Sequence, residues 1–101
     1  MNAQHEVITP GPISTVLEID VNNHAGVMSH IVGLFARRAC NIEGIVCIPS
    51  ADGLTSRIWF LVRDEKLPQM TKHVGNLEDV RAVRRRDKFH DSFKRLPELF
   101  G

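Results

Sequence analysis

The sequence has few cysteines, few aromatic residues and no excess of charge. Its 101 residues include two cysteines, one tryptophan and no tyrosine, and 6% are aromatic. A disulfide-stapled secreted domain carries more cysteine, so the composition favours a cytoplasmic protein. Because 13 basic and 12 acidic residues leave a net charge of +1, no strong field attracts nucleic acid or a membrane. We therefore expect neither as a partner.

Long apolar runs are absent as well. No run approaches the roughly 20 residues that a membrane-spanning helix needs, and the N-terminus MNAQHEVITPGPIS has no apolar signal core. Residues 1–14 contain Pro10, Gly11 and Pro12 and are predicted to form a flexible arm. Residues 87–101 form a polar tail with large apolar side chains that are available to dock on another surface: Phe89, Phe93, Leu96 and Phe100.

Catalytic and metal-binding motifs are also missing. The sequence has no GxSxG, no phosphate loop and no dinucleotide fingerprint. No histidine has a second His or Cys at a compact metal-ligand spacing, and most are expected to be solvated: His5, His24, His30, His73 and His90. Cys40 and Cys47 are interpreted as buried free thiols, and Arg84–Arg86 as a solvated strand end. The sequence thus predicts no catalytic residue and no metal site.

Between residues 15 and 86 the hydrophobic pattern switches between strand and helix periods. Strands are predicted for TVLEIDVN, NIEGIVCI, SRIWFLVR and EDVRAVRRR, with a hairpin turn at Asp52-Gly53. Helical spacing occurs from Gly26 to Ala39 and again in a segment that begins close to Pro68. The order β-α-β-β-α-β indicates an α+β, ferredoxin-like fold: a four-stranded antiparallel sheet with both helices on one face.

That fold leaves the other sheet face open. In the third strand, Ile58 and Phe60 alternate with Trp59 and Leu61, so whichever set meets the helices, the other presents apolar side chains outward. An isolated soluble domain rarely exposes such a patch. We interpret the outward pair, with Trp59 and Leu61 as candidates, as an interface for a protein partner. Partial cover by the tails is the alternative.

The stretch NNHAGVMSHIVGLFARRACNIEGI places one asparagine before a predicted helix and another after it. A helix start exposes unpaired N–H groups and carries a partial positive charge, which suits a carboxylate. Gly26, Val27 and Met28 can offer those N–H groups. Asn23 can offer its side-chain oxygen to an ammonium group or its amide to the carboxylate. These groups together favour an amino acid as the ligand.

Asn41 begins the next strand, at the far end of that helix. A helix from Gly26 to Ala39 is about 20 Å long, so no small molecule touches Asn23 and Asn41 within one chain. Two chains packed antiparallel along the helix would bring the asparagines together, and Gly33 would permit the close approach. A local explanation stays open: Asn23 as a helix cap or turn residue and Asn41 as a left-handed cap.

The same stretch resembles the ACT domain, the amino-acid-sensing member of the ferredoxin-like group. More narrowly, it is similar to the small regulatory subunits of acetohydroxyacid synthase (acetolactate synthase), whose pattern is N-x-x-G-V/A-M/L, then G-L-F-x-R-R, then N-I/V-E. The matching residues are Asn23, Gly26, Val27, Met28, Gly33, Leu34, Phe35, Arg37, Arg38, Asn41, Ile42 and Glu43. The likeness covers residues 15–86, and the length resembles the short, single-ACT form of the isozyme I type.

The resemblance implies a non-catalytic subunit that binds valine, activates a large catalytic subunit and mediates feedback inhibition of branched-chain amino acid biosynthesis. It implies a homodimer whose interface holds valine, or another branched-chain amino acid, near Asn23, Gly26–Met28 and Asn41–Ile42. No cofactor is expected in this chain, whereas thiamine diphosphate, Mg²⁺ and FAD are expected in the catalytic subunit.

Ala25 and Cys40 depart from the family pattern, which often has proline at the first position and an aromatic residue or glycine at the second. Either departure is expected to shift the preference among valine, leucine and isoleucine. Two other functions stay open: a free-standing ACT sensor of another enzyme, and an RNA-binding module of the same topology. RNA binding needs aromatic residues on both central strands, and the adjacent Trp59 and Phe60 fall on opposite faces.

Overall fold

The computed structural model describes residues 14–63, 67–87 and 90–100. Its elements, in chain order, are β1 (Thr15–Asn22), α1 (Val27–Arg37), β2 (Asn41–Pro49), β3 (Thr55–Arg63), α2 (Leu67–Gly75), β4 (Val80–Arg85) and α3 (His90–Phe100). The predicted β-α-β-β-α-β order is confirmed, and α3 adds a helix in the C-terminal tail, where none was predicted. The predicted N-terminal arm, apart from Ser14, lies outside the described residues.

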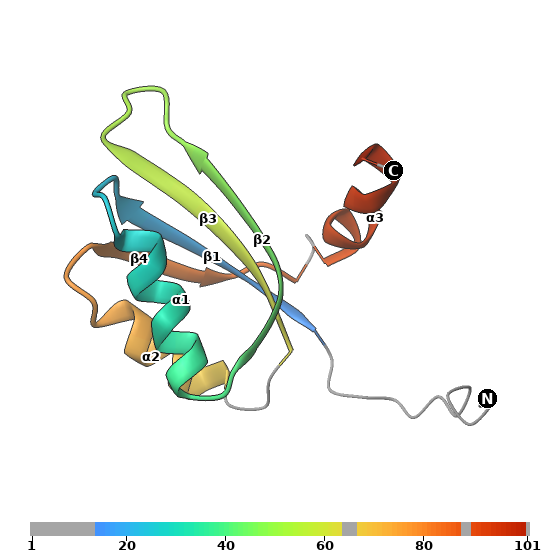
Figure 1. Ribbon diagram of the computed structural model, residues 1–101, viewed down its shortest axis with the longest axis horizontal. Coiled ribbons are helices and arrows are strands. Elements are labelled where there is room, and N and C mark those ends of the chain that lie inside the picture. Colours follow the sequence, from blue (N-terminus) through green and yellow to red (C-terminus); the bar gives the residue numbers. More distant parts are fainter. Residues whose placement is uncertain (1–13, 64–66, 88–89, 101) are drawn as a thin grey trace.

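The strands form one antiparallel sheet in the order β2-β3-β1-β4. Helices α1 and α2 cover one face of the sheet, and α3 lies on the opposite side (Figure 1). The central strands are therefore β1 and β3, while β2 and β4 form the edges. This is the expected ferredoxin-like arrangement, with a third helix added to the face that was expected to be open.

The core fills the space between the sheet and its two covering helices. Leu17 and Ile19 of β1 stand opposite Phe60 and Ile58 of β3 in the ladder. Phe60 also contacts Phe35 of α1, with ring centroids 5.2 Å apart. All five side chains are at most 1% exposed. The predicted alternation is confirmed, and burial of this one set fixes which residues of β1 and β3 face outward.

Turns and helix ends follow local chemistry. Pro68 is the second residue of α2, where its missing N–H costs no helical hydrogen bond. Between β2 and β3, Gly53 has a φ of +72°. Asp52 there accepts hydrogen bonds from the Ser50 hydroxyl (2.6 Å) and the Leu54 N–H (2.9 Å). The predicted hairpin turn and the predicted start of α2 are thus confirmed.

One expectation about the cysteines needs correction. Both are free thiols, but only Cys40 is buried, whereas Cys47 is exposed because it lies on the edge strand β2. In the part of the chain that the structure describes, no helix is long and apolar enough to cross a membrane.

Candidate functional site

The connection between β1 and α1 forms an exposed polar turn. Gly26 occupies the N-cap position of α1 with a φ of +88°, in the left-handed region where a side chain strains the backbone. No side chain caps the helix at this position, and the Gly26 carbonyl accepts a hydrogen bond from the His30 N–H at 2.9 Å. The first N–H groups of α1 therefore follow an exposed glycine, an arrangement that suits an anion.

The predicted effector-binding residues at this end differ in exposure. Asn23 and Gly26 are exposed, Met28 is half-buried, and the Val27 side chain is buried in the core. The Val27 N–H also donates to the His24 carbonyl at 3.3 Å, so this donor is already engaged. Gly26 and Met28 are therefore the better placed N–H donors, while Val27 contributes to the core.

Asn23 ties this turn to the turn between β2 and β3. Its side-chain amide donates to the Gly53 carbonyl (3.0 Å), and its backbone N–H donates to the Leu54 carbonyl (2.9 Å). The cap position belongs to Gly26, so the explanation of Asn23 as a helix cap is wrong and its role in a turn is confirmed. The bond to Gly53 uses one amide hydrogen. An asparagine side chain has a second hydrogen and an acceptor oxygen with which to bind a ligand.

The turn that precedes β4 also contacts the connection between β1 and α1. His24 Nδ1 lies 3.1 Å from the Asp79 carboxylate, and the Asn22 N–H donates to the Asp79 carbonyl at 2.8 Å. The connection before α1 is thus attached both to the β2–β3 turn and to the turn that precedes β4, and these contacts fix the position of the helix start.

The far end of α1 carries the remaining predicted residues. The helix ends at Arg37, and Ala39 takes a φ of +55°, so the left-handed residue is Ala39 and the explanation of Asn41 as a left-handed cap is wrong. Asn41 is exposed as the first residue of β2, and Ile42 is half-buried. The 11 residues of α1 span about 16 Å. Because the two ends of α1 lie apart (Figure 1), one chain does not bring Asn23 and Asn41 together.

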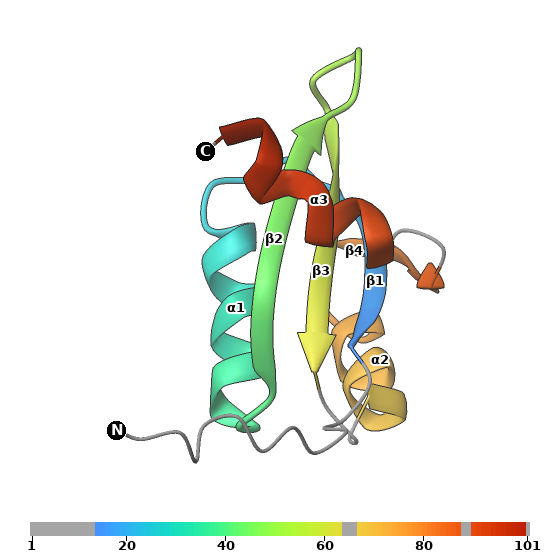
Figure 2. The ribbon, with the colours of Figure 1, turned by 90° about the vertical axis from the view of Figure 1, so that its right-hand side faces the viewer.

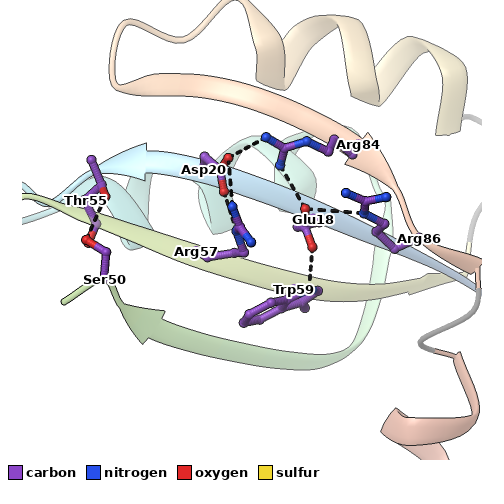
Figure 3. Close-up of polar contacts among 8 residues, drawn as sticks. All are labelled: Glu18, Asp20, Ser50, Thr55, Arg57, Trp59, Arg84 and Arg86. Carbon is purple, nitrogen blue, oxygen red and sulfur yellow. Dashed lines mark hydrogen bonds and ion pairs between the residues drawn. The ribbon is translucent and has the colours of Figure 1, made fainter.

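The sheet face away from α1 and α2 carries a set of paired side chains, termed the outer-face cluster: Glu18, Asp20, Arg57, Trp59, Arg84 and Arg86 (Figure 3). Glu18 is 3% exposed and accepts hydrogen bonds from Trp59 Nε1 at 3.0 Å and from Arg84 at 2.8 Å. Arg86 donates to the same carboxylate at 3.4 Å. Asp20 accepts from Arg57 and Arg84, each at 2.7 Å. The cluster joins β1, β3 and β4 and holds the Trp59 indole.

The two carboxyl groups of the cluster stay charged at neutral pH. Burial raises the pKa of Glu18, but the hydrogen bond from Trp59 and the charges of Arg86 and Arg57 outweigh burial and lower it. Burial also raises the pKa of Asp20, and its hydrogen bonds to Arg84 and Arg57 bring it below the ordinary value.

The interpretation of Arg84–Arg86 as a solvated strand end is therefore wrong for the first and last residues of that run. β4 pairs with β1, and this pairing places Arg84 and Arg86 beside the carboxylates of β1. The sequence contains one signal for the cluster that was missed. Glu18 and Asp20 lie two residues apart in β1, and Arg84 and Arg86 lie two residues apart at the end of β4, so each pair falls on one face of the sheet.

Helix α3 crosses the same face over β2 and β3 (Figure 2). Trp59 and Leu61, the predicted partner-interface residues, face outward, but Leu61 is only 8% exposed. Phe93 and Leu96 of α3 line an apolar cavity of about 220 Å³ together with Val46 and Trp59. Partial cover of the open face by a tail is thus confirmed. Phe89 of that tail lies outside the described residues.

Gly44 of β2 leaves room for the Phe93 ring to lie against the sheet. A Cβ at Gly44 would lie 3.0 Å from Cδ1 of Phe93 and 3.6 Å from the Leu61 side chain. Any larger residue would therefore displace the ring. The far end of α3 is not buried, since Leu99 is 76% exposed and Phe100 is 85% exposed.

No metal site accompanies these surfaces among the described residues, since no group of three His, Cys, Asp or Glu side chains is placed to hold an ion.

Similarity to known proteins is extensive. The family described as the AHAS small subunit-like ACT domain, where AHAS stands for acetohydroxyacid synthase, matches residues 17–82. The acetolactate synthase isozyme 1 small subunit of Escherichia coli K12 is 46% identical over 88 residues, covering 86% of this chain and 92% of that protein. The isozyme 3 small subunit of the same organism is 37% identical over 70 residues, covering 67% of this chain and 43% of that protein.

A solved structure shows the same likeness. The crystal structure of the acetolactate synthase small subunit from Thermotoga maritima is 31% identical to the chain, with a TM-score of 0.68. The match covers 78% of this chain and 50% of the Thermotoga chain, so the chain spans about half the length of that relative.

Proposed function

Because the chain belongs to the AHAS small subunit-like ACT-domain family, we propose that it senses valine and controls the large subunit of an acetolactate synthase. The chain is a small, regulatory subunit, and the catalytic activity lies in the large subunit. The 46% identity to the isozyme 1 small subunit, over 92% of that protein, is the observation that carries the proposal. We also propose that thiamine diphosphate, Mg²⁺ and FAD belong to the large subunit and that the complex is cytoplasmic.

Valine is proposed to bind at the start of α1. Its carboxylate meets the N–H groups of Gly26 and Met28, where the helix end carries partial positive charge. Asn23 offers its side-chain oxygen to the ammonium group. The isopropyl group packs on Met28 and on Ile42 of a second copy. Both side chains are half-buried in one chain and so keep apolar surface for a ligand.

The second copy is required because Asn23 and Asn41 lie at opposite ends of α1. A homodimer with antiparallel α1 helices supplies both asparagines to one valine. The edge strand β2 supports this pairing, since it has a described neighbour on one side only and exposes Ile45 (42%) and Ile48 (53%). Gly33 supports it too. Leaving aside the helix's own backbone, a Cβ built there meets only the Arg37 guanidinium within 4 Å, so this side of α1 is open to a second helix.

The large subunit is proposed to bind the outer sheet face around Trp59 and Leu61. Glu18 holds the Trp59 indole in one orientation, so the aromatic surface is preorganised for a partner. An RNA-binding module is disfavoured by the same geometry. Phe60 is fully buried on the opposite face, and the outer-face arginines Arg57, Arg84 and Arg86 are already engaged by the carboxylates of Glu18 and Asp20.

The test mixes the purified chain with the large acetolactate synthase subunit of the same organism. We expect the two to co-purify, acetolactate formation to rise, and valine to inhibit the complex. Trp59→Ser should reduce activation, whereas the control Leu54→Ser, at a side chain that is 72% exposed in the β2–β3 turn, should not. An amino-acid sensor of another enzyme would bind its ligand in calorimetry yet recover no large subunit, and that result would overturn the proposal.

A further inference from the structure

We propose that α3 is a removable cover of the outer sheet face, and that the large subunit displaces it on binding. This inference rests on the proposed function and goes beyond it, because it gives α3 a regulatory role. The physical reason is exclusion: Val46, Trp59 and Leu61 cannot contact α3 and a partner with the same surface.

The cover has a defined position on the sheet. The pairing of β2 with β3 shifts register between Ile42 and Gly44, and Gly44 then stands opposite Leu61. Since a Cβ at Gly44 would meet the Phe93 ring at 3.0 Å, the glycine keeps open the space that this ring fills. Gly44 and Phe93 therefore determine where α3 contacts the sheet.

The same contact is weak enough to release. Phe93 and Leu96 are only half-buried, and the apolar cavity of about 220 Å³ between α3 and the sheet is partly open to solvent, so α3 does not close tightly over Val46 and Trp59. Pro97 lies inside the helix and removes one of its hydrogen bonds. An isolated helix of 11 residues is also too short to be stable in water. Thus α3 depends on the sheet for its structure, while the sheet holds α3 by few side chains.

Removal of α3 leaves the sheet face intact. The hydrogen bonds to Glu18 and Asp20 come from β3, β4 and Arg86, and none of these donors belongs to α3. No buried polar side-chain atom among the described residues lacks a partner. Uncovering therefore exposes apolar surface and polar groups that are already paired, which is the surface a partner can bury at low cost. The partner that fits is an apolar segment of the large subunit that fills the cavity beside Trp59.

A reversible disulfide tests the displacement. Gly44→Cys and Phe93→Cys, in a Cys47→Ser background, place one thiol in the space of the Phe93 ring and the other on a Cβ at position 44, which would lie 3.0 Å from that ring. Oxidation locks α3 to β2 and reduction frees it, and mass spectrometry reports which state is present. We expect the reduced chain to activate the large subunit and the locked chain to lose at least about tenfold in apparent affinity. Valine affinity, measured by calorimetry, should be equal in both states.

Variants that loosen the cover test the same proposal without a crosslink. Phe93→Ser should raise the apparent affinity for the large subunit several-fold, and Gly44→Ala should act in the same direction. Trp59 is the only tryptophan and the chain has no tyrosine, so its fluorescence should shift to the red in both variants and report the uncovering.

Three results would count against the proposal that the large subunit displaces α3. Equal activation by locked and reduced chains would show that α3 stays in place, and weaker activation by Phe93→Ser would make α3 part of the interface. If the wild-type chain activates nothing, the proposed function itself fails, and the cover proposal fails with it.

Discussion

The variant Asn23→Ala tests whether Asn23 contacts valine directly or only stabilises the turn. The change removes one hydrogen bond, to the Gly53 carbonyl at 3.0 Å in an exposed turn, and its net contribution to folding is about 1 kcal/mol. A hydrogen bond to a charged group of valine contributes about 1.5–3 kcal/mol. Valine affinity should therefore fall about 10- to 100-fold, since about 1.4 kcal/mol corresponds to a factor of ten. Activation should persist, because the large subunit is proposed to bind the outer sheet face around Trp59 and Leu61, away from this turn.

Calorimetry on the isolated chain measures the affinity, and thermal unfolding measures the stability. The matched control is Asp52→Ala, which removes the acceptor of Ser50 and Leu54 and loosens the turn that Asn23 contacts. If Asn23→Ala acts only by loosening this turn, the control will weaken valine binding by a similar factor. A loss confined to Asn23→Ala supports direct contact.

Mixed dimers decide whether the site is shared. Each proposed site takes Asn23 from one copy and Asn41 from the other. A dimer of an Asn23→Ala chain with an Asn41→Ala chain therefore has one site with both changes and one site with neither. An equimolar mixture should regain about a quarter of the wild-type sites, although each variant alone binds weakly. Unchanged affinity in both single variants, or no recovery in the mixture, would refute the shared site.

Three further variants test other parts of the structure. Gly33→Leu should weaken dimerisation in sedimentation without unfolding the chain, because a Cβ there meets only Arg37, at 3.4 Å. Gly26→Ala should destabilise the chain by about 1–2 kcal/mol in urea and weaken valine binding, because its φ of +88° strains any residue with a Cβ. The lowered pKa of Glu18 contributes stability at neutral pH that is lost as the pH falls below about 4. Glu18→Gln should therefore lose less stability on acidification, and parallel pH profiles in urea unfolding would contradict this.

The strands and the first two helices could be predicted because their signals are local. Alternation in TVLEIDVN and helical spacing after Gly26 lie within single segments, and burial follows directly from them. Helix α3 has Phe93, Leu96 and Phe100 at helical spacing, but Pro97 and the polar residues between them argue against a helix. The contact of α3 with the sheet joins residues far apart in the chain, so this segment alone could not show that the helix forms there.

The sequence was enough to place the candidate effector residues at the two ends of α1, but it was less informative about the backbone conformation there. The exposed glycine at the helix start follows from NNHAG, yet the left-handed residue at the other end is Ala39, which no propensity rule selects. The outer-face cluster was missed for a different reason. Its central bond joins Glu18 to Arg84, 66 positions apart, and only the pairing of β1 with β4 brings them together.

The exposure of Leu61 could not be predicted from the sequence, although its orientation could. Strand alternation correctly turns this residue outward, and an outward leucine suggests an open apolar patch. The residue is nevertheless 8% exposed, because α3 lies over this part of β3 and the neighbouring Gly44 makes room for Phe93. A leucine on the outer face must be buried by something to stabilise the fold, and in the isolated chain α3 does so. A partner that takes the place of α3 must therefore bury Leu61 and fill the cavity beside Trp59, or the exchange would expose apolar surface and be unfavourable.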